Sequence, residues 1–432
     1  MVNIRKLVIL ELIEFEENNE YSNLTLNSII KKNELSPLDV KFITMLFYGV
    51  IERKITLDYY ISKLSSKPIN KLSKFVLNTL RVALYQIIYM DKIPSSAAVN
   101  EAVKIIKKSK EHYASGFVNA VLRSFLREKP NLPEGTTPNS LSVIYSCPEW
   151  FVRELIEYIG TDKTISFLQD SLNAPPIYLR CNTTKINETL LIEKLNDEGI
   201  LAQLTEVVGA IKVDKLNSLT HDKLFLNGYY HVEDLASQIF LNAVGFKKGD
   251  RVLDLCAAPG GKTCTIAELI QNEGRIVSCD LHNHRVELIK NNAKRLGLSV
   301  IEPIVNDALN FNSKLGTFDA VLCDVPCSGF GVIRRKPEIK YKPSFDLTNL
   351  PELQYNILNT AKKYLNDGGK LIYSTCTLRY DENEAVIEKF LNNNKNFKLV
   401  KTTVFEEENY YHRLTPDKHK SDGFFFCVLI KE

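Results

Sequence analysis

Apolar residues in the first third of the chain recur every three or four positions, which is the spacing of one face of a helix. Phe42, Met45, Leu46 and Val50 illustrate the pattern, and glycine and strand-like alternation are almost absent from this region. We therefore expect residues 1–130 to form an all-helical bundle.

Capping and turn-forming residues predict where these helices begin and where the bundle ends. Ser36 followed by Pro37 favours a helix start, and Ser95 is expected to cap the helix that runs through AAVNEAVKIIKK. The segment GFVNAVLRSFL has the pattern of a closing helix. Residues 129–140 are rich in Pro, Gly, Thr and Asn, which is the composition of a linker.

The middle of the chain, residues 145–235, mixes the two periodicities. An amphipathic helix (PEWFVRELIEYIG) is followed by a strand (IYLRCN), a second helix (ETLLIEKLNDEGI) and short strand-like pieces that end near YYHVED. This order predicts a small α+β domain.

Strands and helices alternate over residues 236–432. The strands are RVLDLC, RIVSCD, VIEPIVND, FDAVLCD and KLIYSTC, with helices expected from Lys262, Asn283 and Glu382. Such alternation predicts a mostly parallel, seven-stranded α/β sheet of the Rossmann-like class, covered by helices on both faces. The last segments, around RLTP and GFFFCVLI, are expected to pair antiparallel at its edge.

Composition narrows the class of protein. The 432 residues are 44% hydrophobic and 25% charged, which is ordinary for a globular protein and excludes disordered, collagen-like and coiled-coil chains. No apolar run approaches the roughly 20 residues of a membrane span, so we expect a cytoplasmic protein with no membrane partner. Nine scattered cysteines without a CxxC pair favour free thiols over disulfides or a zinc site, and no metal is expected.

Charge is distributed unevenly along the chain. Residues 1–145 hold 20 Lys and Arg against 14 Asp and Glu, whereas acids are in slight excess in the remainder. A basic front end is typical of a protein with a polyanionic partner, although solvated helix faces produce the same imbalance.

Four aspartates, Asp254, Asp280, Asp307 and Asp324, close consecutive apolar strands. A single aspartate at such a place is often only a helix cap. The carboxyl ends of parallel strands meet at one edge of a sheet, where ligands bind. Four aspartates at the ends of consecutive strands therefore predict one shared ligand.

The turn DLCAAPGGKT distinguishes between two kinds of ligand. Residues 261–263 (GKT) resemble the end of a phosphate-binding loop, but Cys256 stands where that motif requires glycine, and G-x-G-x-x-G is absent from this turn. Asp280 follows the second strand, where a carboxylate accepts hydrogen bonds from ribose hydroxyls. A nucleoside without a long phosphate tail fits best, and we expect S-adenosylmethionine with Asp307 near its adenine.

Two cysteines, Cys327 in DVPCSG and Cys376 in YSTCT, lie just past the fourth and fifth strands, whereas most of the others are expected to pack in the core. A thiol beside a methyl donor is useful when the methyl acceptor is C5 of a pyrimidine. Addition of the thiolate to C6 makes C5 nucleophilic; C5 takes the methyl and loses its proton to a base, and the thiolate leaves. Asp324 is placed to stabilise the charge that develops at N3 of cytosine. On these grounds the two thiols are equal candidates for the nucleophile.

The motifs DLCAAPGGKT, DVPCSG, YSTCT and DGFF together resemble those of the RNA 5-methylcytosine methyltransferases, the Sun (NOL/NOP) family. In the front region, LSPLDVKFITMLFYGVIERKITLDYYI, VNEAVKIIKK and GFVNAVLR resemble the NusB-like helical domain of the family's bacterial member that acts on small-subunit ribosomal RNA. The resemblance covers nearly the whole chain. It implies a 16S ribosomal RNA (cytosine-C5)-methyltransferase with a NusB-like RNA-binding domain.

The resemblance also implies roles for individual residues. The Thr-Cys thiol of the family, here Cys376, is the nucleophile, and the Pro-Cys thiol, here Cys327, helps to release the product. The methyl-donor site maps to Cys256, Ala257, Ala258, Pro259, Gly260, Gly261, Lys262, Asp280, Asp307 and Asp324. This sequence departs from the family at Cys181 in the RNA-binding strand, and at Lys336 and Tyr341, where Val, His and Trp are usual.

Arg334, Arg335 and Lys336 form a basic cluster shortly after Cys327. We expect them to hold the phosphates that flank the target base, with a plain charged loop as the alternative. Arg180 lies in the strand that the resemblance assigns to RNA binding. A stacked base must be flipped out, so partly unpaired RNA is the expected substrate, bound by a monomer. The alternative functions are a non-catalytic ribosomal RNA-binding or assembly factor and, less favoured, an NTP-binding enzyme.

Overall fold

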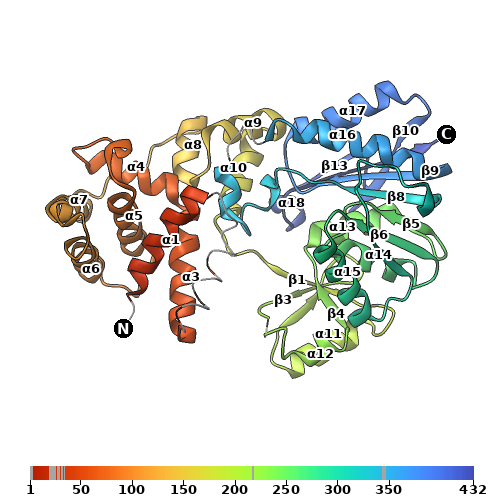
Figure 1. The fold of residues 1–432 in the computed structure, drawn as a ribbon, viewed down its shortest axis with the longest axis horizontal. Coiled ribbons are helices and arrows are strands. Elements are labelled where there is room, and N and C mark those ends of the chain that lie inside the picture. Colours follow the sequence, from red (N-terminus) through yellow and green to blue (C-terminus); the bar gives the residue numbers. More distant parts are fainter. Residues whose placement is uncertain are drawn as a thin grey trace. The chain divides into compact units, whose positions relative to one another are not determined.

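The computed structural model describes the chain apart from residues 1–2, 19–25, 27–29, 31–32, 34, 217 and 343–346. Its contacts divide the chain into two compact units, which we call the helical unit and the sheet unit (Figure 1). The helical unit is Met1–Leu172 with Lys336–Lys342, and the sheet unit is Asn173–Arg335 with Pro343–Glu432. None of the described helices is both long and apolar enough to span a bilayer.

The helical unit confirms the all-helical prediction for the front of the chain. Its helices are α1 (Ile4–Asn18), α3 (Pro37–Glu52), α4 (Lys54–Leu64), α5 (Lys74–Tyr89), α6 (Ser95–Lys107), α7 (Ser115–Glu128), α8 (Pro138–Tyr145), α9 (Glu149–Ile159) and α10 (Thr161–Asp170). The apolar stripes of α3, α5, α6 and α7 meet in one core, where Phe47, Leu80, Ile106 and Leu122 are completely buried. Burial of these stripes, rather than helix propensity, holds the bundle together.

The helix starts were predicted correctly at one position and wrongly at another. The Ser36 hydroxyl accepts a hydrogen bond from the Asp39 backbone N–H at 3.2 Å, so Ser36 caps α3 as expected. Ser95 does not cap α6, because it is already the first helical residue and Pro94 occupies the cap position. The Pro94 carbonyl accepts the first helical hydrogen bond, from Ala97 N–H at 2.9 Å.

The sheet unit begins with a small antiparallel sheet of order β2-β3-β1-β4. The strands are β1 (Ile177–Cys181), β2 (Ala202–Leu204), β3 (Ala210–Val213) and β4 (Tyr230–Val232), accompanied by α11 (Glu188–Asp197) and α12 (Lys223–Leu226). Leu179, Leu191, Leu195 and Ile211 are completely buried between this sheet and its helices. The strand and helix predicted from IYLRCN and ETLLIEKLNDEGI are confirmed.

The large sheet has the order β10-β14-β9-β8-β5-β6-β7, with β13 also paired to β14. Its strands are β5 (Arg251–Asp254), β6 (Arg275–Asp280), β7 (Ile301–Val305), β8 (Phe318–Asp324), β9 (Leu365–Thr375), β10 (Phe397–Val400), β13 (Tyr411–Leu414) and β14 (Phe424–Lys431). Strands β5 to β9 are parallel, and β14 runs antiparallel to its neighbours, as predicted. The predicted edge position of β14 is wrong, because β10 and β13 cover it. The linear path has the expected seven strands. An eighth strand joins because β13 and β10 share the long β14 edge end to end, and β11 (Thr402–Val404) forms a separate hairpin with β12 (Glu407–Asn409).

Helices cover both faces of this sheet (Figure 1). The helices described after the small sheet are α13 (Leu235–Val244), α14 (Gly261–Leu269), α15 (Asn283–Leu296), α16 (Leu350–Ala361), α17 (Glu384–Asn393) and the short α18 (Pro416–His419). Val252 and Ile276 pack in one core with α13, α14 and α15, whereas their neighbours Leu253 and Val277 pack in another with α16 and α17. Two cores follow directly from the alternation of side chains along a strand.

Candidate active site

The strand order places the predicted site residues at one edge of the large sheet. β5 lies between β6 and β8, so the order reverses there, and Asp254, Asp280 and Asp324 are the last residues of β5, β6 and β8. Asp307 follows the end of β7, and Cys376 directly follows β9. The carboxyl ends of parallel strands at such a reversal form the ligand-binding crevice of open α/β sheets.

Two of the aspartates are deeply buried. Asp254 is completely buried and accepts a hydrogen bond from the Thr263 hydroxyl at 2.7 Å. Burial raises the pKa of Asp254 to about 7, since the charged form loses water. The Asp280 carboxylate accepts a hydrogen bond from the His282 backbone N–H at 3.1 Å and lies 3.2 Å from Arg285 Nη1.

The third aspartate, Asp307, lies nearer the surface and binds its own turn. It accepts hydrogen bonds from Leu309 N–H at 3.0 Å and Asn310 Nδ2 at 2.8 Å. This is the local capping role that a single aspartate often has. Its expected contact with adenine stays a prediction.

The glycine turn between β5 and α14 suits a nucleoside-type ligand. Gly260 has a φ of 103°, and a Cβ there would lie 3.2 Å from the Ile289 Cα, so only glycine fits without a shift. No side chain caps the start of α14 at Gly261, and the uncapped N–H groups of a helix start can donate to a ligand. Together with the Asp280 carboxylate, which suits ribose hydroxyls, these groups fit S-adenosylmethionine.

Lys262 and Asp324 form an ion pair inside the site. Lys262 Nζ lies 2.8 Å from Asp324 Oδ2, and the Ser374 hydroxyl donates to Asp324 Oδ1 at 2.8 Å. Burial alone would lower the pKa of Lys262, but the Asp324 carboxylate raises it above its usual value. A phosphate-binding lysine points its charge at phosphate oxygens. Because Lys262 is instead paired with Asp324, the arrangement disfavours the NTP-binding interpretation.

The two candidate thiols face each other. Cys327 Sγ and Cys376 Sγ are 3.1 Å apart and within hydrogen-bonding distance, and both residues are half-buried. The hydrogen bond with Cys376, together with burial, raises the pKa of the Cys327 thiol well above its usual value. Cys376 is one of the groups that raise the pKa of Lys262, so the Lys262 ammonium lies close to this sulfur.

The loops that carry the thiols are bound to one another. The residues that follow the two cysteines, Ser328 and Thr377, share a hydrogen bond between their hydroxyls at 2.8 Å. The buried Glu382 carboxylate accepts hydrogen bonds from Ser328 N–H at 2.8 Å and from Gln354 Nε2 at 3.0 Å. These contacts fix the sulfur atoms relative to each other.

Two glycines, Gly331 and Gly423, bring the loops around the thiols into close contact. Gly331 N–H donates to the Cys376 carbonyl at 2.9 Å, and Gly423 N–H donates to the Gly331 carbonyl at 2.9 Å. A Cβ on Gly331 would lie 1.9 Å from the Gly423 carbonyl oxygen, so neither loop has room for a side chain there. This contact explains why DGFF, far along the sequence, accompanies the two cysteine motifs.

Sequence reasoning missed the polar residues that support the thiols. Ser374, Thr377, Glu382 and Gln354 were not predicted as site residues. Ser374 carried a usable signal, because it lies two positions before Cys376 near the end of β9 and its register partner is Asp324. Glu382 gave no such signal in the sequence, since it belongs to the acidic run RYDENE, a composition typical of a solvent-exposed segment.

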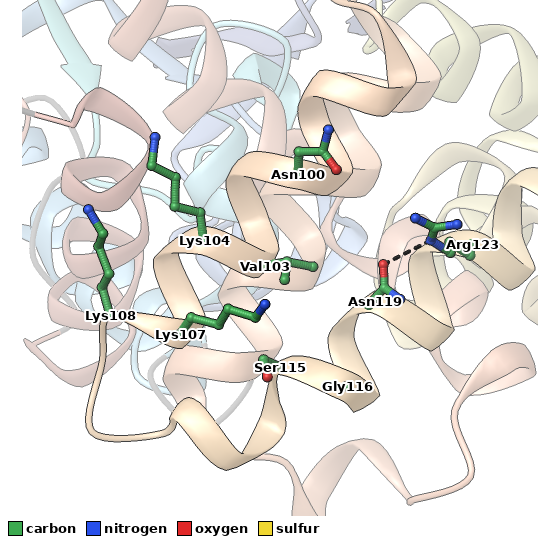
Figure 2. A pocket seen from close by; sticks show the side chains of 9 residues that line it. All are labelled: Asn100, Val103, Lys104, Lys107, Lys108, Ser115, Gly116, Asn119 and Arg123. Carbon is green, nitrogen blue, oxygen red and sulfur yellow. Dashed lines mark hydrogen bonds between the residues drawn. The ribbon is translucent and has the colours of Figure 1, made fainter.

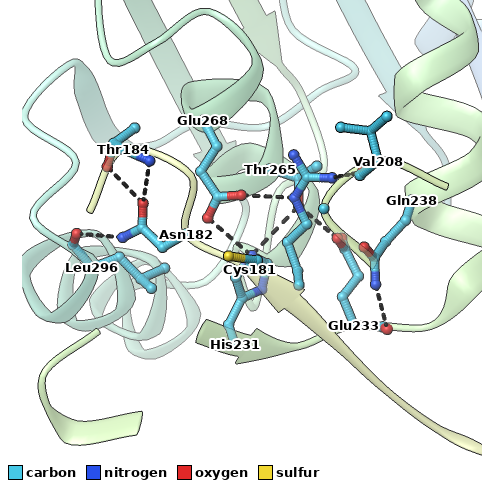
Figure 3. A network of polar contacts seen from close by, with 12 residues as sticks. Cys181, Asn182, Thr184, Val208, His231, Glu233, Gln238, Thr265, Glu268 and Leu296 are labelled. Carbon is cyan, nitrogen blue, oxygen red and sulfur yellow. Dashed lines mark hydrogen bonds and ion pairs between the residues drawn. The ribbon is translucent and has the colours of Figure 1, made fainter. Parts of the chain in front are cut away.

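Arg180 is a correction to the predicted RNA contacts. Its side chain is only 1% exposed, and its Nε lies 2.8 Å from Glu268 Oε2. Figure 3 shows Glu268 together with His231, Glu233 and Thr265 in the polar network of this region, and His231 Nε2 is 3.4 Å from the same carboxylate. A guanidinium buried in this way cannot reach RNA without unfolding its surroundings. We therefore assign Arg180 a structural role in place of the predicted one.

The basic cluster after Cys327 is largely neutralised by acids. Arg334, with a side chain 4% exposed, pairs with Asp422, so its expected role in holding phosphates is also corrected to a structural one. Arg335 is partly exposed and pairs with Asp422 and with Asp234, the latter at 2.7 Å. Lys336 is exposed and belongs to the segment Lys336–Lys342 of the helical unit. RNA contacts by Arg335 and Lys336 stay predictions.

The remaining cysteines are set apart from this chemistry. Cys264, Cys279, Cys323 and Cys427 are buried in the two cores of the large sheet, which agrees with their predicted packing role. Burial raises the pKa of each of these thiols. Cys147 and Cys181 are also buried, and Cys256 is half-buried at the donor turn.

Three family models match separate regions of the chain. A family described as 16S rRNA methyltransferase RsmB/F matches residues 241–430. The NusB family matches residues 2–127, and a ferredoxin-like domain of RsmF/B-type methyltransferases matches residues 147–220.

Individual relatives extend over the whole length. The probable ribosomal RNA small subunit methyltransferase B of Bacillus subtilis is 37% identical over 100% of this chain and 99% of its own. The ribosomal RNA small subunit methyltransferase B of Escherichia coli is 30% identical over 93% of this chain and 92% of its own. The crystal structure of PH0851 superimposes with a TM-score of 0.80, at 27% identity over 100% of this chain and 99% of that one. The chain belongs to the RsmB/F family of 16S ribosomal RNA methyltransferases, which take their methyl group from S-adenosylmethionine.

Proposed function

We propose that the protein methylates C5 of a cytosine in 16S ribosomal RNA through a covalent bond between Cys376 and C6 of the base. The observation that carries the proposal is the pair of thiols 3.1 Å apart, beside the Lys262–Asp324 ion pair and at the same sheet edge as the donor turn. Methyl transfer to an oxygen or an exocyclic nitrogen needs no thiol. Carbon C5 does, because it is a weak nucleophile until C6 is substituted.

Cys376 acts as the nucleophile in this proposal. The thiolate adds to C6, the electron pair of the C5–C6 double bond moves toward C5 and N3, and C5 becomes able to accept a methyl group. The family resemblance supports this division, because it assigns the nucleophile's role to the Thr-Cys thiol and product release to the Pro-Cys thiol. The contact with Cys376 and burial raise the pKa of the Cys327 thiol. The nearby ammonium of Lys262 stabilises the thiolate.

Asp324 acts on the other side of the ring. As the thiolate adds, the proton held between Lys262 and Asp324 passes to N3 through the Asp324 carboxyl group, which neutralises the charge that develops on the base. Lys262 and Ser374 hold that carboxyl group in place, at 2.8 Å each. Asp324 is therefore a positioned partner for the base rather than a freely rotating surface acid.

The donor turn and Asp280 hold the methyl donor. When bound, S-adenosylmethionine supplies the methyl group as an electrophilic carbon. Gly260 and Gly261 keep the turn free of side chains, and Asp280 accepts from the ribose hydroxyls. After methylation a base removes the proton from C5, the C6–sulfur bond breaks, and the electron pair returns to Cys376.

Replacement of Cys327 by alanine should slow the last step. Cys327 Sγ is 3.1 Å from the sulfur that must leave, so we expect the variant to accumulate the covalent complex with RNA, visible as a protein band of higher mass in a denaturing gel. Turnover should fall at least tenfold, since each molecule stays bound to its product. If the Cys327→Ala variant turned over at the normal rate and accumulated no covalent complex, the role assigned to Cys327 would be wrong.

The proposed function is tested directly with modified RNA. Unmodified 16S ribosomal RNA and labelled S-adenosylmethionine should yield 5-methylcytidine as the labelled nucleoside after digestion. RNA with 5-fluorocytidine should form a stable adduct, because fluorine at C5 cannot leave as a proton. A labelled ribose, or a label on another base, would show a different reaction.

We further propose three functional regions. The NusB-like region (1–130) and the small α+β region (145–235) bind ribosomal RNA, and the Rossmann-like region (236–432) carries out methyl transfer. The matches to three separate domain families support this division.

A further inference from the structure

Polar side chains at an open surface need no protein partner, because water solvates them. The groove between α6 and α7 in the helical unit is of this kind, and Lys104, Lys107 and Arg123 line it with exposed charges (Figure 2). The sheet unit contains a contrasting set of polar side chains that are completely buried near the two thiols. They are Ser328, Gln354, Tyr373, Thr377, Glu382 and Asn383. Burial of polar groups costs free energy unless each is hydrogen-bonded, so their contacts indicate what the set holds in place.

Gln354 on α16 and Glu382, which precedes α17, bind the backbone on both sides of Cys327. Gln354 Nε2 donates to the Pro326 carbonyl at 3.0 Å, and this carbonyl belongs to the peptide before the cysteine. Glu382 Oε2 accepts from the Ser328 N–H at 2.8 Å, and this N–H belongs to the peptide after it. The two side chains also bind each other, since Gln354 Nε2 lies 3.0 Å from Glu382 Oε2. One pair of side chains therefore fixes both peptide groups of Cys327.

Further buried groups hold this pair of side chains. The Tyr373 hydroxyl donates to the Glu382 carbonyl at 2.5 Å and lies 3.3 Å from Gln354 Oε1. Arg379 Nη1 lies 3.2 Å from Glu382 Oε1, so the buried carboxylate has a cationic partner. The hydrogen bond to the partner thiol and burial raise the pKa of the Cys327 thiol, and the Glu382 charge raises it further. This carboxylate therefore acts on the sulfur as well as on the backbone.

The next residue, Asn383, binds the residues on both sides of Cys376. Its Oδ1 accepts from the Thr375 hydroxyl at 2.6 Å, and its Nδ2 donates to the Thr377 carbonyl at 3.1 Å. Two adjacent residues, Glu382 and Asn383, therefore hold different thiols.

From these contacts we infer that Gln354 and Glu382 position Cys327 for the release of the methylated product. Asn383 positions Cys376 for its attack on C6 of the base, so the two steps depend on different side chains. The inference rests on the proposed function, since it concerns the steps assigned there to the two thiols. A small displacement of a reacting group lowers the rate of the step that uses it. Each positioning residue should therefore affect mainly the step of its own thiol.

Two RNA substrates separate the two steps in the full chain. On 5-fluorocytidine RNA only addition and methyl transfer occur, so the rate of adduct formation reports on Cys376. On unmodified RNA with S-adenosylmethionine, the covalent complex persists in a denaturing gel only when release is slow. The lifetime of that complex therefore reports on Cys327.

Gln354→Met removes the amide group and nearly conserves the size of the side chain. This variant should form the fluorinated adduct within about twofold of the normal rate, and its complex with unmodified RNA should persist about tenfold longer. Asn383→Ala should give the opposite pattern, with adduct formation about tenfold slower and no persistent complex. Equal effects of either variant on both steps, or no effect on either step, would overturn the inference.

A matched control distinguishes position from stability. Gln86 is a buried glutamine of α5 in the helical unit, and its Nε2 donates to the Val82 carbonyl at 2.7 Å. Gln86→Met should leave both rates unchanged, and an equal delay in Gln86→Met and Gln354→Met would contradict the inference. Tyr373→Phe keeps the ring in the core, removes the contact with the Glu382 carbonyl, and should lengthen the lifetime of the complex about threefold. This variant decides the question if Gln354→Met does not fold, and a normal lifetime would then count against the inference.

The double variant Cys327→Ala/Gln354→Met tests whether Gln354 acts through Cys327. Its complex should persist no longer than that of Cys327→Ala, because a positioning residue has no further effect once the group that it positions is gone. A further delay in the double variant would show that Gln354 acts in another way. Absence of the adduct in the unmodified protein would refute the proposed function, whereas normal formation and release in the variants would refute this inference alone.

Discussion

Alanine in place of Cys376 should abolish methylation, with a loss of about three orders of magnitude or more, as expected when a nucleophile is removed. Without the thiolate, C6 stays unsubstituted and C5 keeps its aromatic, weakly nucleophilic character. The Cys327 sulfur, which we assign to product release, should not take over this role, because burial also raises the pKa of its thiol. The measurement is incorporation of labelled methyl groups into 16S ribosomal RNA, together with adduct formation on 5-fluorocytidine RNA. Both signals should disappear.

Cys181→Val is the matched control for the loss of one thiol. Cys181 is buried in β1, and valine conserves its size and apolar character. This variant should keep normal activity and form the adduct. If Cys376→Ala still formed the adduct while Cys327→Ala did not, the roles of the two sulfur atoms would have to be exchanged.

The second large effect is expected at Arg180. Replacement by methionine leaves the Glu268 carboxylate buried without its partner at 2.8 Å. Removal of one member of a buried ion pair lowers the free energy of unfolding by about 3–5 kcal/mol, because the remaining charge is buried without its guanidinium. The His231 ring, 3.4 Å away, is then the nearest polar partner of Glu268. Urea denaturation followed by circular dichroism measures this change. The variant should unfold at markedly lower urea concentration.

The double variant Arg180→Met/Glu268→Met supplies the control. It removes both charges and should recover most of the lost stability, since an apolar pair of similar volume often replaces a buried ion pair without penalty. An Arg180 that served RNA binding would give the opposite result. Stability would then be nearly unchanged in Arg180→Met, and the affinity for RNA would fall.

Much of the fold could be predicted from the sequence because local patterns agree with the tertiary structure. Alternating strands and helices predicted the parallel sheet, and the ends of those strands predicted where Asp280, Asp324 and Cys376 would meet. That prediction needs no knowledge of side-chain contacts, since the carboxyl ends of parallel strands always share an edge. The equivalence of Cys327 and Cys376 could not be resolved in this way. The structure places the two sulfur atoms 3.1 Å apart with both residues half-buried, so their separate roles stay a proposal that rests on the family resemblance.

The errors concern buried charges with distant partners. Arg180 lies 88 positions from Glu268, and Arg334 lies 88 positions from Asp422. A sequence pattern marks an arginine near a binding motif as a phosphate contact, and it contains no sign of a carboxylate that will be placed against it. Ser95 shows the same limit locally, because the choice between Pro94 and Ser95 as the cap depends on one backbone angle. Boundaries of this kind follow from packing rather than from composition.

The register of β8 against β9 determines which residues meet in the site. Asp324 pairs with Ser374, and Cys327 and Cys376 follow these two residues by only a few positions. A side chain changes face with every single step along a strand. One inserted or deleted residue near the end of β9 would therefore turn Cys376 to the opposite side of the sheet. Such a protein should lose the pairing of the two thiols and, with it, the methyl transfer that we propose.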